Sequence, residues 1–336
     1  MGKIQSMRFI SPLPRPADSI EQEDVVAVSM NNEFEIQFHA PVMDGAPLDH
    51  VAIVVNGFGQ LSDLPYNDPQ SGICSRLAQR NIASVLFPLP FHMNRWPKDL
   101  GEYRHQRNPT FLVFNDKKRF YQGYIQYLAD LEGLIQLLTA GGDEFPIRLA
   151  PNAKIHLIGY SMGGLAILAY RLFARAQGTS TTGCNILLAS GCSMRTLVPS
   201  DIGVSADKWM PFREHYMRVF HTTLSPDDAA DFKHRIFRKI FLGKQDDDLD
   251  GHLESMTSNT FIIIGSEDEV NALRHVSSGL DNIPKYTTLV IPGWSHLMQE
   301  RSSNKFTLPW QEWSGFIIEA IANYVHELSS QTPKSS

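Results

Sequence analysis

The chain has 336 residues, of which 43% are hydrophobic and 20% are charged, an ordinary composition for a globular protein. Its net charge of -6 gives no reason to expect a nucleic-acid partner. No apolar run approaches the roughly 18 residues that a membrane-spanning helix needs, and the first 24 residues lack the apolar core of a signal peptide. The length fits one large α/β domain with an insertion, or two domains.

The chain begins with a polar, proline-containing stretch over residues 1–22, which predicts a loosely held N-terminal arm. Gly2 followed by Ser6 also fits the N-myristoylation pattern. Such a short pattern is common by chance, so an unmodified terminus is favoured. The cysteines are odd in number and widely spaced, which favours a reducing, cytoplasmic setting over a disulfide framework. They are Cys74, Cys184 and Cys192.

Eight segments have the composition of β-strands. Val51–Val55 is a continuous apolar run rich in β-branched residues, which is typical of a strand covered on both faces. Glu33–His39 instead alternates apolar and polar side chains. The other predicted strands cover residues 25–29, 82–87, 154–158, 184–189, 261–264 and 287–291.

Helical patterns fall between these strands. Residues 120–138 carry apolar side chains three or four positions apart, and Gly141 with Gly142 marks the end of that helix. Further helices are predicted at residues 70–80, 161–176, 269–280 and 310–328. Because strands and helices alternate, we predict an α/β fold with a mostly parallel central sheet flanked by helices.

The predicted sheet has an interruption. Residues 193–258 contain helical stretches but no convincing strand, which predicts a helical cap inserted into the core. The core itself would comprise residues 23–192 and 259–330, followed by a polar tail over residues 331–336.

The most informative motif is Gly159-Tyr160-Ser161-Met162-Gly163-Gly164. It follows the predicted strand at 154–158 and opens a predicted helix, and strand, Gly-x-Ser-x-Gly and helix in that order form a nucleophile elbow. A serine hydroxyl is a poor nucleophile unless it is held toward the substrate beside a base. A sharp turn achieves this, and it leaves no room for side chains at Gly159 and Gly163.

Two further strand ends carry candidate partners for Ser161. Asp268 follows the strand at 261–264, and His296 follows the strand at 287–291. Since functional groups gather at the carboxyl ends of parallel strands, we expect all three to meet there. Acidic residues flank Asp268 on both sides, and because a helix N-terminus attracts acids for electrostatic reasons alone, the residues by themselves leave Glu267 and Glu269 as alternatives.

With these motifs, the chain resembles the α/β-hydrolase superfamily over roughly residues 25–328. The elbow is similar to that of serine esterases and lipases. The resemblance implies that Ser161 attacks the acyl carbon, that His296 transfers the proton and that Asp268 orients the imidazole. It also implies an oxyanion hole made by the backbone N–H groups of Phe58 and Met162, with no metal and no organic cofactor.

The predicted oxyanion loop, which follows Val51–Val55, departs from the common pattern. It reads Asn56-Gly57 where many relatives have His-Gly. The donor is a backbone group, so we expect the change to affect the shape of the loop more than the mechanism.

Substrate-binding candidates come from the strand ends and the cap. They are Asn56, Gly57, His92, Arg95, Tyr160, Trp209 and Trp294. Residues 88–119 contain an excess of Lys and Arg, which fits either a solvated loop or a basic rim that attracts an anionic substrate. Aromatic and methionine side chains of the cap suit an apolar acyl pocket, although they could equally form the cap's own core. No cysteine–histidine spacing indicates a metal site.

The sequence therefore predicts a serine hydrolase that cleaves a carboxylic ester, with a medium-chain or lipid-like acyl group and no cofactor. Two alternatives remain open. The same three residues could act on a thioester, amide, lactone or carbon–carbon bond. Alternatively, the pocket could belong to a non-catalytic protein that serves as a ligand receptor or scaffold.

Overall fold

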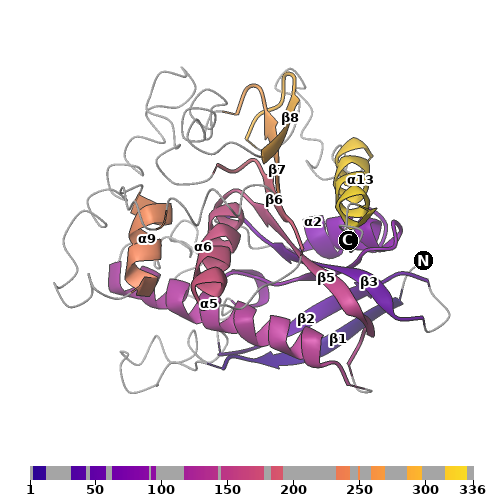
Figure 1. Ribbon diagram of the computed structural model, residues 1–336, viewed down its shortest axis with the longest axis horizontal. Helices are drawn as coiled ribbons and strands as arrows, with labels where there is room; N and C mark the ends of the chain where they lie inside the picture. The colour runs from indigo at the N-terminus through magenta and orange to yellow at the C-terminus, as the bar shows by residue number, and fades with distance from the viewer. Residues whose placement is uncertain are drawn as a thin grey trace, which may run out of the picture.

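The computed structural model describes most of the predicted core. The residues it describes are 3–12, 32–42, 46–57, 63–90, 92–95, 117–142, 145–177, 183–191, 232–242, 249, 259–268, 286–296 and 315–330. They form one eight-stranded sheet with helices on both faces (Figure 1). The chain therefore has the mostly parallel α/β architecture that the sequence predicts.

The strands lie side by side in a non-sequential order. Their bounds are β1 (Lys3–Ile10), β2 (Glu33–Ala40), β3 (Leu48–Val55), β4 (Ala83–Leu86), β5 (Leu149–Tyr160), β6 (Asn185–Leu188), β7 (Thr260–Gly265) and β8 (Tyr286–Ile291). The order across the sheet is β1-β2-β4-β3-β5-β6-β7-β8. β1 and β2 run antiparallel to their neighbours, and all pairs from β4 to β8 are parallel. The parallel strands therefore end at one common edge.

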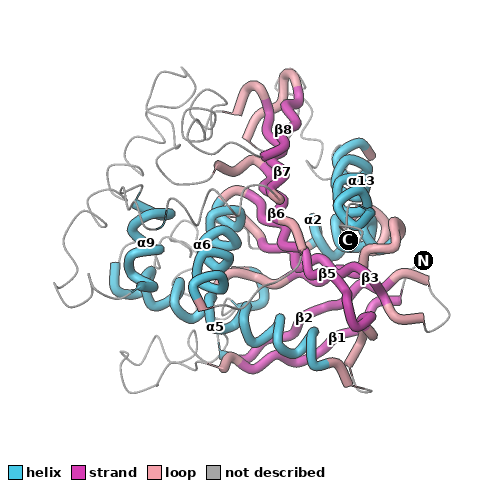
Figure 2. Tube along the Cα trace, viewed as in Figure 1, coloured by secondary structure: helices cyan, strands magenta, loops and turns pink. Residues whose placement is uncertain are grey.

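Helices cover the sheet on two sides (Figure 2). Their bounds are α2 (Leu64–Asn67), α3 (Ile73–Ala78), a short 3-10 helix η2 (Met93–Arg95), α5 (Lys117–Ala140), α6 (Met162–Ala176), α9 (Phe232–Leu242) and α13 (Phe316–Ser330). The apolar side chains of α5, α6 and α9 share one core cluster, and those of α2, α3 and α13 share the other. No helix among the described residues is both long and apolar enough to span a membrane.

Strand β3 shows why the central strands are apolar throughout. Val51, Ile53 and Val55 belong to the first core cluster, while Ala52 and Val54 belong to the second. Successive side chains of a strand point to opposite faces, so a strand covered on both sides needs an apolar residue at every position.

The N-terminal arm is a correction. Residues 3–10 of the predicted loose arm form β1, which pairs along its whole length with β2. Most of β1 is exposed or partly exposed, and Phe9 is its buried apolar anchor, 2% exposed and packed edge-on against Phe87. β1 is an edge strand in which only Phe9 is buried. Such a strand does not need the alternation of apolar and polar residues by which a strand is recognised in a sequence.

Part of the predicted cap is also corrected. Within residues 193–258, α9 packs on the α5/α6 layer, where Ile236, Phe237 and Ile240 are fully buried in the main core. The rings of Tyr124 on α5 and Phe237 lie 5.3 Å apart. This part of the predicted cap therefore packs in the flanking layer of the core.

Several predictions lie outside the described residues. These are the strand at 25–29, the helix at 269–280, the tail at 331–336 and the remainder of the predicted cap apart from Leu249. Among the described elements, α3 is shorter than the helix expected at 70–80. α13 begins at Phe316, and residues 310–314 of the helix expected at 310–328 lie outside the described residues.

Candidate active site

Ser161 lies at the turn between β5 and α6, at the carboxyl edge of the sheet. Its backbone is held at φ 49° and ψ -117°, in a region that residues with a Cβ rarely adopt. The Ser161 N–H donates to the Leu188 carbonyl at 2.8 Å, and the Ser161 carbonyl accepts from Gly164 N–H at 2.9 Å. Strain of this kind persists only where the surroundings fix it, and it concentrates at functional sites.

Two glycines make this turn sterically feasible, as the sequence predicts. A Cβ on Gly159 would lie 2.4 Å from the backbone carbon of Gly163, and one on Gly163 would lie 2.5 Å from the Asn56 carbonyl oxygen. The close approach brings the start of α6 against the end of β3. The backbone of the turn that carries Ser161 is therefore in direct contact with the backbone of the predicted oxyanion loop at Asn56.

The three side chains predicted from separate strand ends form one hydrogen-bonded line. Ser161 Oγ lies 3.0 Å from His296 Nε2. On the other side of the ring, His296 Nδ1 lies 3.0 Å and 3.1 Å from the two carboxylate oxygens of Asp268. A carboxylate can only accept, so Nδ1 carries the proton and Nε2 is left to accept from the Ser161 hydroxyl.

Backbone contacts fix the loops that carry Asp268 and His296 relative to each other. Ser266 N–H donates to the Ile291 carbonyl at 2.9 Å, and Glu267 N–H donates to the Trp294 carbonyl at 2.9 Å. A Cβ on Gly265 would lie 2.0 Å from that same Trp294 oxygen. These backbone contacts fix the two loops relative to each other independently of the contact between the Asp268 and His296 side chains.

Exposure differs along the line of three groups. Asp268 is 1% exposed and His296 8%, whereas Ser161 is only half-buried. The carboxylate is thus shielded from water while the hydroxyl remains accessible. Hydrogen bonds and charge interactions are stronger in such a shielded setting than in water.

The predicted oxyanion loop is held by a buried amide. Asn56, which is 0% exposed, donates from Nδ2 to the Gly57 carbonyl at 2.7 Å and accepts at Oδ1 from Leu89 N–H at 2.8 Å. Asn56 therefore shapes the loop and does not face a substrate, which corrects its assignment as a binding residue. Phe58 lies outside the described residues.

Met162 is the first residue of α6. The N–H groups of a helix's first turn have no acceptor within the helix, and they point toward whatever lies beyond its N-terminus. The Met162 N–H therefore lies in the first turn of α6, next to Ser161.

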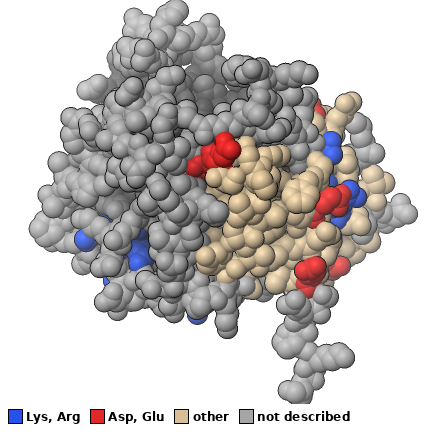
Figure 3. Space-filling model, turned by 90° about the horizontal axis from the view of Figure 1, so that it is seen from above, with Lys and Arg blue, Asp and Glu red and all other residues tan. Residues whose placement is uncertain are grey.

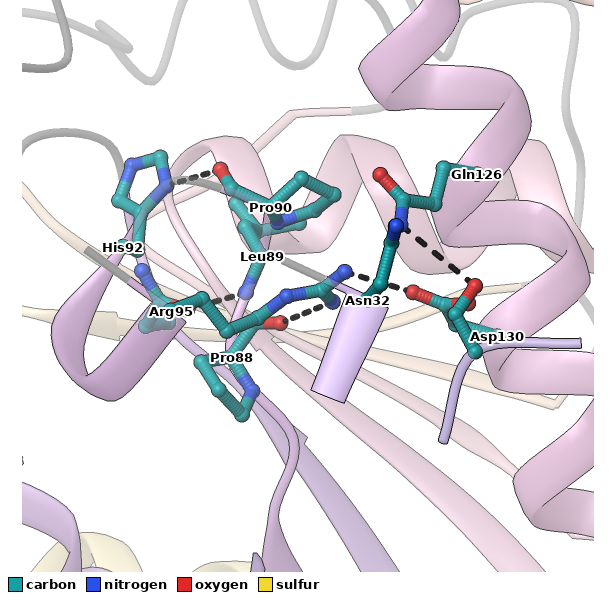
Figure 4. Close-up of polar contacts among 10 residues, drawn as sticks. Asn32, Pro88, Leu89, Pro90, His92, Arg95, Gln126 and Asp130 are labelled. Atoms are coloured by element: carbon teal, nitrogen blue, oxygen red, sulfur yellow. Dashed lines mark hydrogen bonds and ion pairs between the residues drawn. The ribbon is translucent and has the colours of Figure 1, made fainter. Parts of the chain in front are cut away.

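His92 and Arg95 do not line an accessible rim, contrary to prediction. Arg95 is 0% exposed and its Nη2 lies 2.7 Å from Asp130 Oδ2 on α5 (Figure 4). Its Nη1 donates to the Pro88 carbonyl at 3.1 Å, and its guanidinium lies over the Phe34 ring. The positive charge of this segment suggested an exposed basic rim. Arg95 is buried instead because it pairs with the buried carboxylate of Asp130, which is distant in the sequence.

His92 is buried for a related reason. It is 2% exposed and donates from Nδ1 to the Pro90 carbonyl at 2.9 Å. Burial lowers the pKa of His92 to about 4, assisted by the nearby Arg95 charge. The ring is therefore neutral and structural near neutral pH.

Asp130 is the residue that sequence reasoning missed. Its Oδ1 accepts from Ser11 Oγ at 2.5 Å, so this buried carboxylate joins α5 both to the segment after β4 and to the end of β1. Its spacing within the predicted helix at 120–138 offered a signal. Asp130 stands beside Tyr127 and Leu131 on the apolar face, where a carboxylate requires a buried partner.

The remaining substrate-binding candidates divide into two groups. Tyr160 is 6% exposed and Trp294 is partly buried against the second core cluster. Trp209 and the basic residues at 96–116 lie outside the described residues. On the face seen in Figure 3, Lys and Arg side chains lie beside Asp and Glu side chains at the right of the view, while an acidic group near the centre and basic side chains at the lower left stand apart from one another. Within the described part of the chain, no group of three metal-ligating side chains comes together.

Comparison with solved structures identifies the fold. The chain is similar to the peroxisomal α/β-hydrolase Lpx1 from Saccharomyces cerevisiae, at 15% identity and a TM-score of 0.53, over 100% of this chain and 92% of that one. It is also similar to a puromycin-hydrolysing peptidase from Mycobacterium tuberculosis, at 12% identity and a TM-score of 0.53, over 97% of this chain and 39% of that one.

A third similar structure is a proposed dienelactone hydrolase from Klebsiella pneumoniae, at 11% identity and a TM-score of 0.50, over 97% and 99% of the two chains. No protein-family model and no curated protein sequence matches the chain. At these identities the likeness concerns the fold, and the chain has the α/β-hydrolase fold.

Proposed function

We propose that this protein is a serine hydrolase that cleaves a carboxylic ester through an acyl–Ser161 intermediate. The observation that carries the proposal is the line from Ser161 Oγ through His296 to Asp268, with contacts of 3.0 Å at each ring nitrogen. The strained backbone of the half-buried Ser161 supports it further.

In the first half-reaction, Ser161 Oγ attacks the acyl carbon while His296 Nε2 takes the hydroxyl proton. The resulting imidazolium is stabilised by the Asp268 carboxylate, to which Nδ1–H already donates. When the carbon–oxygen bond of the ester breaks, the same proton passes from Nε2 to the leaving alkoxide. In the second half-reaction, water repeats the sequence on the acyl–enzyme and regenerates Ser161.

Negative charge develops on the acyl oxygen in both tetrahedral intermediates. We assign its stabilisation to the backbone N–H groups of Met162 and Phe58. One such donor contributes about 3 kcal/mol to catalysis in serine hydrolases. The position of Met162 at the N-terminus of α6 supports the first assignment, and the second rests on the sequence resemblance.

The fold alone does not select the bond, since proteins of this architecture include peptidases and a proposed lactone hydrolase. We assign a carboxylic ester because the elbow around Ser161 is similar to that of serine esterases and lipases. The acyl group is proposed to be apolar and lipid-like. The buried Arg95 is not available to bind an anionic substrate. The free, buried thiols of Cys74 and Cys184 support a reducing, cytoplasmic setting.

A panel of matched substrates tests the assignment. The purified protein would be given an ester, a thioester, an amide and a lactone with the same acyl chain, alongside a chain-length series of p-nitrophenyl esters. We expect kcat/KM to be highest for the ester. Faster thioester, amide or lactone cleavage would keep the triad and replace the substrate class. No turnover of any member, without phosphonate labelling, would favour a ligand receptor.

A further inference from the structure

Tyr160 lies between the three elements of the proposed active site. It is the last residue of β5, directly before Ser161, and it is only 6% exposed. Its side chain therefore faces protein and not substrate. The contacts that it makes assign it a different role from the binding residue expected from the sequence.

The first contact is with the loop that carries His296. The Tyr160 hydroxyl donates to the His296 carbonyl at 2.9 Å, and the two rings lie 5.9 Å apart at an interplanar angle of 28°. Asp268 holds the imidazole at Nδ1. The backbone and the ring of His296 are thus fixed by two separate partners.

The second contact is with the oxyanion loop. A Cβ on Gly57 would lie 2.6 Å from Cδ1 and 3.0 Å from Cε1 of the Tyr160 ring, so the ring packs directly against the Gly57 backbone. On its other side that loop is held by Asn56, through the Gly57 carbonyl and Leu89 N–H. The glycine at position 57 is therefore required by the tyrosine at position 160.

From these contacts we propose that Tyr160 is a positioning residue that sets His296 and the oxyanion loop at fixed positions relative to Ser161. The proposal rests on the proposed function. Three elements from different parts of the chain converge on one buried side chain, so a displacement of any one is transmitted to the others. Small displacements matter because a misplacement of about 1 Å can reduce the rate of a reaction by roughly 100-fold.

The test is Tyr160→Phe, which keeps the ring against Gly57 and removes only the hydroxyl. The matched control is Tyr170→Phe, which removes a hydroxyl that donates to Glu132 Oε2 at 2.6 Å from a fully buried ring on α6. With p-nitrophenyl butyrate, we expect Tyr160→Phe to lower kcat about 10- to 100-fold with KM changed by less than about twofold. The control is expected to keep kcat within about twofold.

Two further readouts separate positioning from simple loss of stability. The rate constant for labelling by a fluorophosphonate should fall with kcat in Tyr160→Phe. The low-field NMR signal of His296 Nδ1–H should shift or broaden in that variant alone, because the loop that holds the ring has lost an anchor.

The outcomes are distinct. If the wild-type enzyme is active, and Tyr160→Phe has the same kcat and the same His296 NMR signal as the control Tyr170→Phe, the positioning role is overturned. The proposed function is then unaffected. Wild-type protein that neither reacts with the phosphonate nor hydrolyses esters would overturn the proposed function, and the positioning role with it.

Discussion

Two histidines in this protein each lie beside a potential nucleophile, in very different surroundings. His296 Nε2 is 3.0 Å from the hydroxyl of Ser161, and His156 Nδ1 is 3.1 Å from the thiol of Cys184. The first pair is at the carboxyl edge of the sheet. The second is inside it, where His156 on β5 is 0% exposed and Cys184 just before β6 is 1% exposed.

The partners at the other ring nitrogen separate the two pairs. His296 Nδ1 faces the Asp268 carboxylate, which can stabilise an imidazolium. His156 Nε2 faces Nδ1 of His50 at 3.1 Å, a second imidazole that offers no negative charge. The Cys184 backbone N–H also donates to His156 Nδ1, at 3.2 Å.

Burial then determines the proton positions in the second pair. It raises the pKa of the Cys184 thiol to about 12 and holds the pKa of His156 well below its usual range. The thiol stays protonated and the imidazole neutral near neutral pH. The comparison teaches that an adjacent base does not by itself make a nucleophile: a carboxylate behind the base and access for the substrate are also needed.

The largest expected effect comes from removing the carboxylate that separates the pairs. Asp268→Asn presents an amide N–H to His296 and disfavours the tautomer with the proton on Nδ1. We expect kcat for p-nitrophenyl butyrate to fall about 10⁴-fold, with little change in stability. Glu267→Gln is the matched control, because Glu267 is the exposed neighbour, and it should keep kcat within about twofold. Equal losses in both variants would contradict the assignment of Asp268.

A buried ion pair extends the comparison from chemistry to stability. Arg95→Met leaves the Asp130 carboxylate buried without its cation, and we expect the free energy of unfolding to fall by about 3–5 kcal/mol in urea titrations. The matched control is Arg80→Met, which removes the exposed ion pair between Arg80 and Glu319, and it should cost about 1 kcal/mol or less. Similar losses in the two variants would show that Arg95 is not held in the core.

The buried histidines should also make stability depend on pH. The folded-state pKa of His92 is about 4, below its unfolded value of 6.5, so between these values the unfolded chain binds more protons. Stability is therefore fully present above pH 6.5 and is lost as pH falls toward 4. For His92 the loss between about pH 7.5 and about pH 5 is about 2 kcal/mol. The lowered pKa values of His39, His50 and His156 act in the same direction.

His92→Asn measures this contribution, because asparagine keeps an N–H donor near Nδ1 and does not titrate. We expect the difference in unfolding free energy between the two pH values to shrink by about 2 kcal/mol in the variant. An unchanged pH dependence would mean that His92 is accessible to protons in the folded protein.

The smallest expected effect concerns Cys184. Iodoacetamide at about pH 8 should leave Cys184 unmodified in the folded protein and alkylate it in urea, since only a thiolate reacts. Cys184→Ala should change kcat/KM by less than about twofold, because the backbone N–H at position 184 still donates to His156. Rapid alkylation of the native thiol would remove the distinction between the two pairs.

Strand ends made the candidate site predictable from sequence. Ser161, Asp268 and His296 each follow an apolar run, and the edge of a parallel sheet brings such positions together. The structure places Asp268 toward His296 and leaves Glu267 exposed.

What sequence missed depends on contacts between distant segments. The burial of Arg95 is determined by Asp130, 35 residues further along the chain. β1 forms by pairing with β2. Its own residues carry little apolar signal, so the sequence did not predict a strand there. The sequence marks Tyr160 and Gly57 only as separate binding candidates, and their contact in the fold gives them a shared role.

The most direct test of the account is the stoichiometry and location of fluorophosphonate labelling. Wild-type protein should take up about one probe per chain, mapped by peptide mass spectrometry to Ser161, and Ser161→Ala should take up none while remaining folded. Asp268→Asn should label far more slowly than wild type. Folded wild-type protein that stays unlabelled, or that is labelled at another residue, would contradict the claim that Ser161, His296 and Asp268 act together on an acyl substrate.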